Sequence, residues 1–203
     1  MKIICIGRNY VAHAKELNNP IPEKPVFFMK PDTALLPPHN PFFYPDFSND
    51  VHYEAELVLK INKNGRHIAE KFAHKYYNEL SVGIDFTARD LQADCKKKGL
   101  PWEIAKAFDF SAPVGNFKSI NTFENTSNIP FGLKINGDLR QQGNSSNMIF
   151  SFDRIIAYVS QFVTLRSGDL IFTGTPEGVG PARREDYFEL FLADEKVLDF
   201  KVK

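Results

Sequence analysis

The chain has 203 residues, 43% hydrophobic and 25% charged, and its 25 Lys and Arg balance 25 Asp and Glu. This length suits one hydrophobic core, so we expect a single domain over residues 1–203. Zero net charge argues against a general nucleic-acid or membrane-surface binder. No apolar run approaches the roughly 18 residues that span a bilayer, or the roughly 7–15 residues of a signal-peptide core at the start of the chain. Two distant cysteines, Cys5 and Cys95, indicate neither disulfides nor zinc, so we expect a cytoplasmic location.

The first half of the chain has the pattern of short strands and helices separated by turns and irregular segments. Pro, Asn and Asp mark the breaks, and short apolar runs between them predict strands. The predicted elements are a strand over 3–6, a loop and short helix over 8–20, a strand over 25–31, an irregular segment over 35–50, a strand over 53–61 followed by a hairpin turn over 62–65, a helix over 67–78 and a strand over 80–86.

In the second half, local chemistry marks several element ends. Residues 88–99 predict a helix closed by Gly99, with the lysine run 96–98 in its last turn, where cations complement the helix dipole. Asn136-Gly137 predicts a tight hairpin, and apolar spacing predicts a helix over 151–165. A turn followed by a buried strand within 167–174 (SGDLIFTG) and two closing strands over 187–192 and 196–202 complete the series. Together with 19 Phe and 13 Pro, this predicts a sheet-dominated α+β fold with a few peripheral helices.

Three carboxylates lie within or at the end of short apolar runs. Glu54 and Glu56 are two residues apart, so in a strand they point to the same face. Asp85 is flanked by Ile84 and Phe86, which indicates burial. Buried like charges need a positive partner, and three carboxylates suit a hard divalent cation such as Mg²⁺ or Mn²⁺. The alternative for Glu-x-Glu is a solvated sheet face.

Residues spaced three apart on predicted helices form two further pairs. His13 and Glu16 share a helix face, so the carboxylate could orient the imidazole as a general base, unless both are surface residues. Arg89 and Gln92 follow Asp85 and could hold a substrate carboxylate, whereas Arg89 could instead pair with a structural acid.

Lys106 and a glycine-rich segment are the remaining candidates. Lys106 lies in an apolar stretch, where a lysine needs an acidic partner or a functional reason, such as stabilising an oxyanion or enolate, unless it extends to solvent. Residues 173–180 (TGTPEGVG) lack the pattern of a Walker A or dinucleotide-binding loop. The segment suits a tight active-site loop, or a structural turn.

These segments together resemble the fumarylacetoacetate hydrolase family, in particular its short single-domain acylpyruvase members. The resemblance rests on GRNYVAHAKE, PVFFMKPDTAL, HYEAEL, GIDFTARDLQADCKKKGLPWEIAKAFD, INGDLRQ with GNSSNMIF, and GDLIFTGTPEGVGP, in this order over nearly the whole chain. After Pro181 the chain is more charged than the family pattern and lacks its glycine-rich turns. The resemblance therefore does not fix the final hairpin or a dimer edge.

The resemblance implies a mixed β-roll built around a pseudo-barrel, a homodimer, and a bound Mg²⁺ or Mn²⁺. It implies that the metal ligands are Glu54, Glu56 and Asp85, that His13 and Glu16 form a catalytic pair on a lid helix within 8–20, and that Lys106 is catalytic. It also implies that Arg89, Gln92 and Thr175 bind a small 2-keto or 2,4-dioxo acid.

The expected reaction is metal-dependent hydrolysis of the carbon–carbon bond of an acylpyruvate, giving pyruvate and a carboxylic acid. In this scheme His13 deprotonates the attacking water, and Lys106 helps to hold the pyruvate enolate. The same site could instead decarboxylate or tautomerise oxaloacetate, or isomerise or hydrate an unsaturated 2-keto acid, because these reactions share an enolate. A metal-binding protein without catalysis is disfavoured by the joint presence of His13, Glu16 and Lys106. A phosphoryl-transfer site is disfavoured because no phosphate-binding loop is present.

Overall fold

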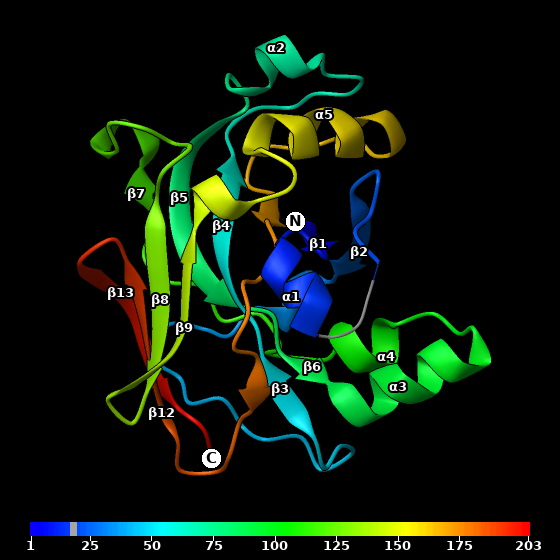
Figure 1. Ribbon diagram of the computed structural model, residues 1–203, viewed down its shortest axis with the longest axis vertical. Coiled ribbons are helices and arrows are strands. Elements are labelled where there is room, and N and C mark those ends of the chain that lie inside the picture. The colour runs from blue at the N-terminus through cyan, green and yellow to red at the C-terminus, as the bar shows by residue number, and fades with distance from the viewer. Residues whose placement is uncertain (17–19) are drawn as a thin grey trace.

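A computed structural model of the chain describes residues 1–16 and 20–203, so residues 17–19 of the predicted lid segment lie outside the described part. Strands dominate, and most helices are short (Figure 1). In chain order the elements are β1 (Ile3–Gly7), α1 (Val11–Glu16), β2 (Val26–Lys30), η1 (Asp32–Ala34), β3 (Val51–Tyr53), β4 (Ala55–Ile61), α2 (Glu70–Ala73), β5 (Tyr77–Ile84), β6 (Thr87–Ala88), α3 (Arg89–Lys98), α4 (Glu103–Lys106), β7 (Lys118–Ser119), η2 (Ile120–Thr122), β8 (Pro130–Ile135), β9 (Asp138–Asn144), η3 (Ser145–Asn147), α5 (Phe152–Phe162), β10 (Leu170–Phe172), β11 (Gly180–Pro181), β12 (Tyr187–Leu192) and β13 (Glu195–Lys201).

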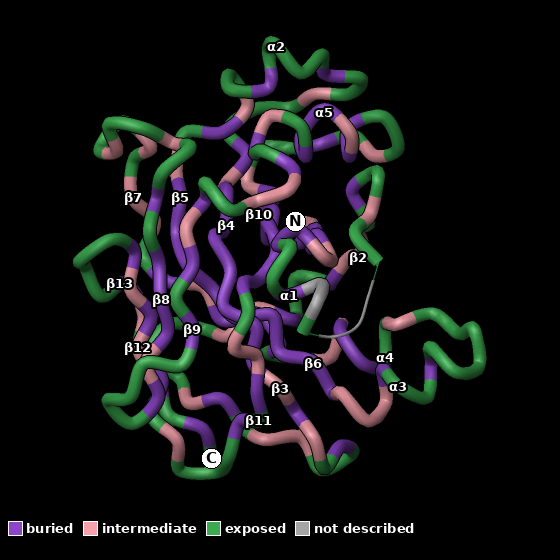
Figure 2. The backbone as a smooth tube through the Cα atoms, viewed as in Figure 1, coloured by how far each residue is buried: buried purple, intermediate pink, exposed green. Residues whose placement is uncertain are grey.

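A six-stranded mixed sheet forms the centre of the molecule, in the order β2-β1-β10-β4-β5-β7. β1 and β10 run parallel although they lie far apart in the chain, and the other neighbours are antiparallel. Figure 2 shows that β4, β5 and β10 are buried over most of their length. Burial on both faces explains why β10 (LIF) and the middle of β4 (LVL) are continuous runs of apolar residues rather than alternating ones.

A four-stranded antiparallel sheet, in the order β13-β12-β8-β9, packs beside the central sheet (Figure 1). Phenylalanine rings fill the space between them: Phe86 lies edge-on to Phe188, and Phe188 stacks on Phe200 with 5.1 Å between ring centroids. Such aromatic pairs add to the free energy of burial. The sheet-rich α+β architecture predicted from the sequence is confirmed.

A small third sheet, in the order β11-β3-β6, lies where the chain changes direction. The predicted continuous strand over 53–61 is wrong in one respect, because β3 ends at Tyr53 and β4 begins at Ala55. β3 pairs with β6 and β11, whereas β4 pairs with β5 and β10. Glu54 therefore occupies the junction where the chain passes from one sheet to another.

Two local predictions after β4 are wrong. The predicted helix over 67–78 is reduced to the four residues of α2, because Tyr77 already begins β5 and pairs with Ile61. The predicted hairpin turn over 62–65 does not form: β4 and β5 are antiparallel neighbours, but residues 62–76 separate them, and Gly65 bridges to Leu165 instead. In both cases pairing between distant segments overrides a local pattern.

Predictions based on end-capping and turn chemistry are confirmed. α3 ends at Gly99, which adopts the left-handed conformation (φ 65°). Asn136 and Gly137, both with positive φ, join β8 to β9. Ser151 caps α5 by accepting the Arg154 N–H. The charged C-terminal segment also forms its hairpin, since β12 and β13 pair without a glycine turn and Ala193 takes the left-handed position (φ 51°).

Among the helices of the described residues, none is long and apolar enough to cross a membrane.

Candidate active site

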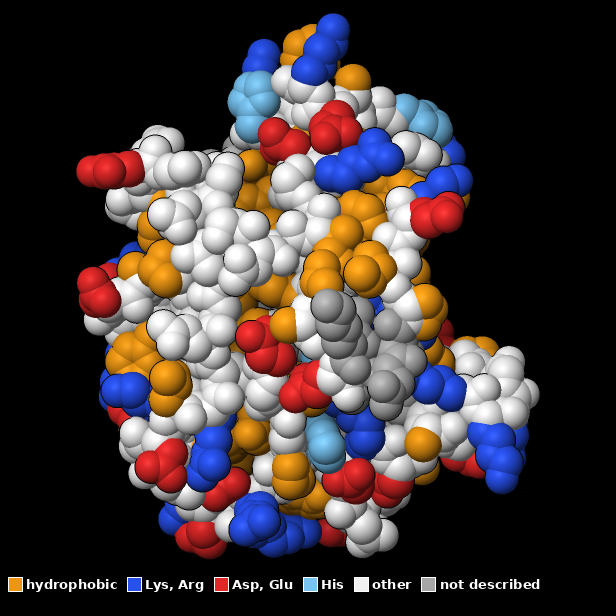
Figure 3. All heavy atoms as spheres, in the orientation of Figure 1, with side chains coloured by type: hydrophobic (Ala, Val, Ile, Leu, Met, Phe, Trp, Pro, Cys, Tyr) orange, Lys and Arg blue, Asp and Glu red, His pale blue; other side chains and the backbone are white. Residues whose placement is uncertain are grey.

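A small cavity lies between the carboxyl ends of β1 and β5 and the helices α1, α3 and α4. The space inside that admits the centre of a water molecule is about 40 Å³, more than the ~10–15 Å³ that one water requires. All nine site residues predicted from the sequence except Glu16 line it. On the face shown in Figure 3, acidic, basic and histidine side chains lie side by side in the lower half. The lining residues are Ile6, Gly7, Arg8, His13, Val26, Phe28, Glu54, Glu56, Asp85, Arg89, Gln92, Lys96, Trp102, Lys106 and Thr175.

Three carboxylates converge at the base of this cavity. Glu54 comes from the junction of β3 and β4, Glu56 from β4, and Asp85 from the residue after β5. The Asp85 N–H donates to the Glu54 carbonyl (2.8 Å), which holds the two backbones together. One carboxylate oxygen of each residue lies within 4.8 Å of those of the other two. All three residues are buried, so the alternative of a solvated sheet face is excluded.

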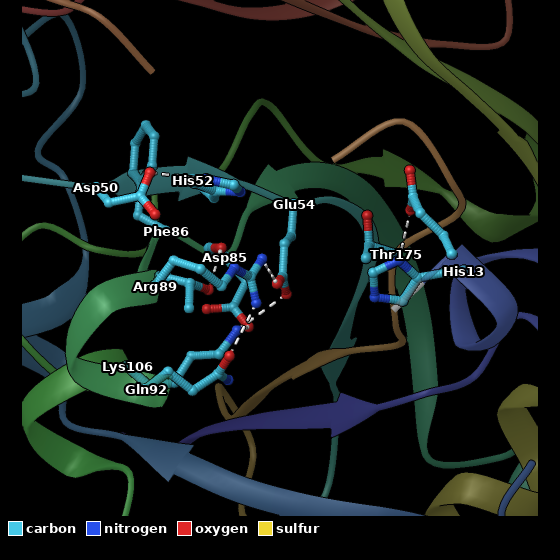
Figure 4. A network of polar contacts seen from close by, with 12 residues as sticks. His13, Asp50, His52, Glu54, Asp85, Phe86, Arg89, Gln92, Lys106 and Thr175 are labelled. Carbon is cyan, nitrogen blue, oxygen red and sulfur yellow. Dashed lines mark hydrogen bonds and ion pairs between the residues drawn. The ribbon is translucent and has the colours of Figure 1, made fainter. Parts of the chain in front are cut away.

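Three cations compensate this buried negative charge (Figure 4). Lys106 Nζ donates to Glu54 (2.9 Å) and Asp85 (2.7 Å), and Arg89 donates to the other Glu54 oxygen (2.7 Å). Lys30 Nζ lies 2.8 Å from Asp85 Oδ1, and it also donates to the Phe86 carbonyl and to Ser111. Lys106 is 3% exposed and so does not extend to solvent.

The two glutamates have opposite pKa shifts because the neighbouring cations pair with Glu54 and not with Glu56. Burial opposes ionisation of Glu54, yet Lys106 and Arg89 hold its pKa well below the ordinary value. Burial, followed by the charges of Asp85 and Glu54, raises the pKa of Glu56 well above its ordinary value. Glu56 has no ion-pair partner among the described residues, and its Oε2 accepts the Gly174 N–H at 2.6 Å. The cluster is therefore short of positive charge at Glu56.

The donor set fits a hard divalent cation. It consists of carboxylate oxygens alone, which Mg²⁺ and Mn²⁺ prefer. Asp85 Oδ1 is buried, and its partner among the described residues is the Lys30 ammonium at 2.8 Å. The charge deficit at Glu56 is what a metal ion would satisfy.

His13 faces the carboxylates from the opposite wall, on α1 (Figure 4). Its Nδ1 lies 3.2 Å from Glu16 Oε2, while Glu16 Oε1 accepts the Gly178 N–H at 3.1 Å. With Glu16 ionised, Nδ1 carries the proton and Nε2 keeps its lone pair. Glu16 thus joins α1 to the glycine-rich loop. The alternative that both are surface residues is therefore wrong for His13, which is 5% exposed, although Glu16 is exposed.

Arg89 and Gln92 lie side by side on the first turns of α3, with Arg89 donating to Gln92 Oε1 at 2.9 Å. Arg89 pairs with Glu54, so it has an acidic partner of the kind that the sequence left open as the alternative to substrate binding. Its Nε is buried without a hydrogen-bond partner among the described residues. One donor of Arg89 therefore remains available to a ligand.

Thr175 lies beside Glu56 in the loop after β10, and its hydroxyl donates to the Ala55 carbonyl (2.9 Å). Gln141 of β9 donates to the same hydroxyl (2.9 Å) and accepts the Ala55 N–H (2.9 Å). Gly174 has φ 102°, and a Cβ there would lie 2.6 Å from the Cβ of Asn9. The glycine is required for this loop to bring its N–H to Glu56.

Sequence reasoning missed four residues of this region. Lys30 and Gln141 are buried behind the carboxylates and Thr175, while Arg8 and Lys96 line the cavity. Lys96 was assigned only to the end of a helix, although its spacing of seven from Arg89 places both on one helix face. For Lys30 and Gln141 the sequence offers no comparable signal, because distant segments create their surroundings.

Comparisons with known proteins agree with this geometry. The family model described as fumarylacetoacetate (FAA) hydrolase C-terminal matches residues 2–201. The mitochondrial oxaloacetate tautomerase of Bos taurus is 42% identical over 201 residues, covering 99% of this chain and 91% of that one. The mitochondrial oxaloacetate decarboxylase of Dictyostelium discoideum is 42% identical over 183 residues, covering 90% and 84%.

A solved structure shows the same fold. The fumarylpyruvate hydrolase of Pseudomonas aeruginosa, in complex with Mn²⁺ and pyruvate, superposes with a TM-score of 0.94 at 38% identity, covering 100% of this chain and 89% of that one. The resemblance predicted from the sequence is thus confirmed. The match of the family model over nearly the whole length, together with relatives above 40% identity, places this chain in the fumarylacetoacetate hydrolase family.

Proposed function

We propose that the protein is a divalent-metal-dependent enzyme that interconverts the keto and enol forms of oxaloacetate. The observation that carries this proposal is the convergence of three buried carboxylates, Lys106 and His13 on one small cavity. Relatives named as oxaloacetate tautomerase and decarboxylase support oxaloacetate over the acylpyruvate expected from the sequence. The small cavity also suits a short substrate better than a long acyl group.

We assign the metal to Glu54, Glu56 and Asp85, with Mg²⁺ or Mn²⁺ as the candidates. When bound, such a cation supplies Lewis-acid polarisation of the substrate's 2-keto oxygen. A relative in the same family has been solved with Mn²⁺ and pyruvate, which supports both the metal class and a 2-keto acid ligand.

The protein's own groups would move the protons. His13 Nε2, with Glu16 holding Nδ1, would take a proton from C3 of the keto form, and a proton added to the 2-oxygen would complete the enol. Lys106 would stabilise the negative charge that develops on that oxygen. Arg89 and Gln92 would hold the 1-carboxylate, for which Arg89 has an unused buried donor. Thr175 would act as a wall of the substrate site, since its hydroxyl proton is already used by Ala55.

We further propose that the chain acts as one catalytic domain and that α1 serves as the lid. The match of the family model over residues 2–201 supports the first part. The lid role is supported by the position of His13, a residue of α1 whose side chain lines the cavity. A homodimer and a cytoplasmic location remain predictions. The curated relatives named here are mitochondrial.

Hydrolysis of a 2,4-dioxo acid is the second candidate, and the His13–Glu16 pair favours it. In that reaction His13 would deprotonate a water that adds to the C4 carbonyl. The C3–C4 bond would break with its electrons kept on C3, giving the pyruvate enolate and a carboxylic acid. Similarity to a fumarylpyruvate hydrolase supports this candidate.

The test is a comparison of substrates under controlled metal. Enol-to-keto conversion of oxaloacetate is followed by ultraviolet absorbance with Mg²⁺, after EDTA, and after Mg²⁺ is restored, while pyruvate, CO₂ and acetate are measured separately. We expect metal-dependent tautomerisation that exceeds any release of pyruvate. Pyruvate and acetate from acetylpyruvate, without tautomerisation of oxaloacetate, would overturn the proposal in favour of hydrolysis.

A further inference from the structure

The outer part of the cavity carries two cations that the carboxylates do not use. Arg8 and Lys96 both line it, together with Trp102, Val26 and Phe28. Lys30, Arg89 and Lys106 already pair with the carboxylates at the base. Among residues 1–16 and 20–203, no carboxylate lies within ion-pairing distance of Arg8 or Lys96. The positive charge of the outer wall is therefore surplus and available to an anionic ligand.

Lys96 is directed toward the cavity by its helix and by an aromatic ring. Arg89, Gln92 and Lys96 are spaced at i, i+3 and i+7 on α3, so they share the face that borders the cavity. The ammonium group lies 5.4 Å from the centre of the Trp102 ring, a cation–π contact that holds it against the wall. Arg8, Arg89 and Lys96 all line this one cavity, and burial, followed by the charges of Arg89 and Arg8, lowers the pKa of Lys96.

The backbone around Arg8 is fixed. Asn9 is fully buried, and its side chain donates to the carbonyls of Phe150 (3.1 Å) and Thr173 (2.7 Å) and accepts the Phe150 N–H (2.7 Å). Arg8 itself has φ 60°, a left-handed conformation that few non-glycine residues adopt. Such strained residues concentrate at functional sites. Arg8 is thus presented to the cavity by a rigid segment.

A guanidinium and an ammonium at one end of a cavity match the chemistry of a carboxylate. We propose that Arg8 and Lys96 form a subsite for the substrate carboxylate remote from the 2-keto acid group, so that the enzyme selects dicarboxylic 2-keto acids over monocarboxylic ones. This subsite rests on the proposed function, because the inner cations and the metal must hold the 2-keto acid end. Trp102 and Phe28 line the same cavity, and because Lys96 is exposed and Arg8 half-buried, the subsite lies at the mouth of the cavity.

The test compares two ligands that differ in the remote carboxylate. Binding of 3,3-difluorooxaloacetate, which has no C3 proton to lose, and of pyruvate is measured by calorimetry on the Mg²⁺-loaded full chain. The variants are Arg8→Gln and Lys96→Met, which remove one charge each. Lys97→Met is the matched control, because Lys97 is the next residue on α3 and does not line the cavity. Thermal unfolding verifies that each variant is folded.

We expect each site variant to bind difluorooxaloacetate about 10–100-fold more weakly, the usual loss for one charge-assisted contact, with pyruvate binding unchanged. For oxaloacetate turnover, KM should rise while kcat changes little, which is the signature of lost ground-state binding. Lys96→Arg should restore most of the affinity. Lys97→Met should behave as the wild type.

Two results would overturn the subsite. One is that Arg8→Gln and Lys96→Met weaken the binding of difluorooxaloacetate and pyruvate equally, or leave the binding of both unchanged. The other is a wild-type protein that binds difluorooxaloacetate no more tightly than pyruvate. Failure of the proposed function is distinguishable: a wild type that prefers the dicarboxylic ligand, and loses this preference in the variants, supports the subsite even if oxaloacetate is not tautomerised.

Discussion

Two groups of ion pairs in this molecule have similar distances and very different surroundings. At the cavity, Lys106 lies 2.7 Å from Asp85 and 2.9 Å from Glu54, with every partner buried. At the surface, Lys118 of β7 lies 2.6 Å from Glu195 of β13, and Lys196 lies 2.7 Å from Asp199 within β13, with every partner substantially exposed. Water solvates the second group whether or not the pairs form, whereas the first group depends on its partners. Burial, rather than distance, decides which charges matter to the fold.

The strongest test of this contrast removes Lys30. Its ammonium is fully buried, and it pairs with Asp85 Oδ1 and donates to the Phe86 carbonyl and to Ser111. Lys30→Met keeps the side-chain volume and leaves those acceptors unpaired. We expect the free energy of unfolding without metal to fall by about 3–5 kcal/mol, the usual cost of breaking a buried pair. Urea unfolding followed by circular dichroism measures it, and a change below about 1 kcal/mol would contradict the account.

A second variant, Lys106→Met, separates catalysis from metal binding. We expect kcat for oxaloacetate to fall by about 10²–10³, because the developing enolate loses one electrostatic partner. Affinity for Mn²⁺ should instead rise, since a cation that competes for Glu54 and Asp85 is gone. Calorimetric titration with Mn²⁺ and steady-state kinetics give the two values. Weaker metal binding in this variant would show that Lys106 supports the metal site rather than opposing it.

The histidine is tested in the same way. His13→Ala should lower kcat by about 10²–10³ if the imidazole moves the proton, with little change in Mn²⁺ affinity. Glu16→Gln should keep part of the activity, because an amide can still accept from Nδ1–H while carrying no charge. A near wild-type rate in His13→Ala would remove this residue from the mechanism.

Because Glu56 is buried, we expect both metal affinity and stability to depend on pH. Its pKa is raised from 4.5 by burial and by Asp85 and Glu54, so the folded protein holds a proton there that a divalent cation must displace. We expect Mn²⁺ affinity to fall by up to about tenfold per pH unit below the raised pKa, with a proton released on binding. Without metal, the stability of the protein should show the opposite trend. The unfolded chain loses the Glu56 proton near pH 4.5 while the folded protein keeps it, so the free energy of unfolding should decrease as the pH rises from 4.5 toward the raised pKa.

Calorimetry in buffers of different ionisation enthalpy counts the released proton. Glu56→Gln is the control, since it cannot titrate and should lose both pH trends. Mn²⁺ affinity that is independent of pH across the range below neutrality would show that Glu56 is ionised before the metal arrives.

The smallest effect belongs to the surface. Lys118→Ala removes the pair with Glu195, and we expect the free energy of unfolding to change by less than about 0.5 kcal/mol. Urea unfolding of Lys118→Ala and Lys30→Met in parallel compares the loss of a surface ion pair with the loss of a buried one. A loss comparable to that of Lys30→Met would mean that distance, and not burial, sets the weight of these pairs.

The same contrast explains what the sequence could predict. End-caps and turns are local, so the end of α3 at Gly99 and the Asn136-Gly137 hairpin were predictable from a few neighbouring residues. Pairing between distant segments is not local, which is why the helix over 67–78 and the turn over 62–65 were wrong.

For the site, patterns of charge within apolar runs located Glu54, Glu56, Asp85 and Lys106, which the fold brings together. Lys30 was missed because its acidic partner lies 55 positions further along the chain, just after the end of β5. Arg8 was missed because only the folded chain brings it to the same cavity as Lys96.

The two contacts of Glu16 tie the orientation of His13 to the position of α1. Glu16 holds the imidazole of His13 with one oxygen and the N–H of Gly178 with the other. If α1 acts as the proposed lid, its opening would break both contacts together, so the imidazole would be held in its working orientation only while α1 is docked. An arrangement of this kind would leave His13 unable to accept the proton until the substrate is enclosed. Opening of α1 would then release the product and inactivate the base in the same step.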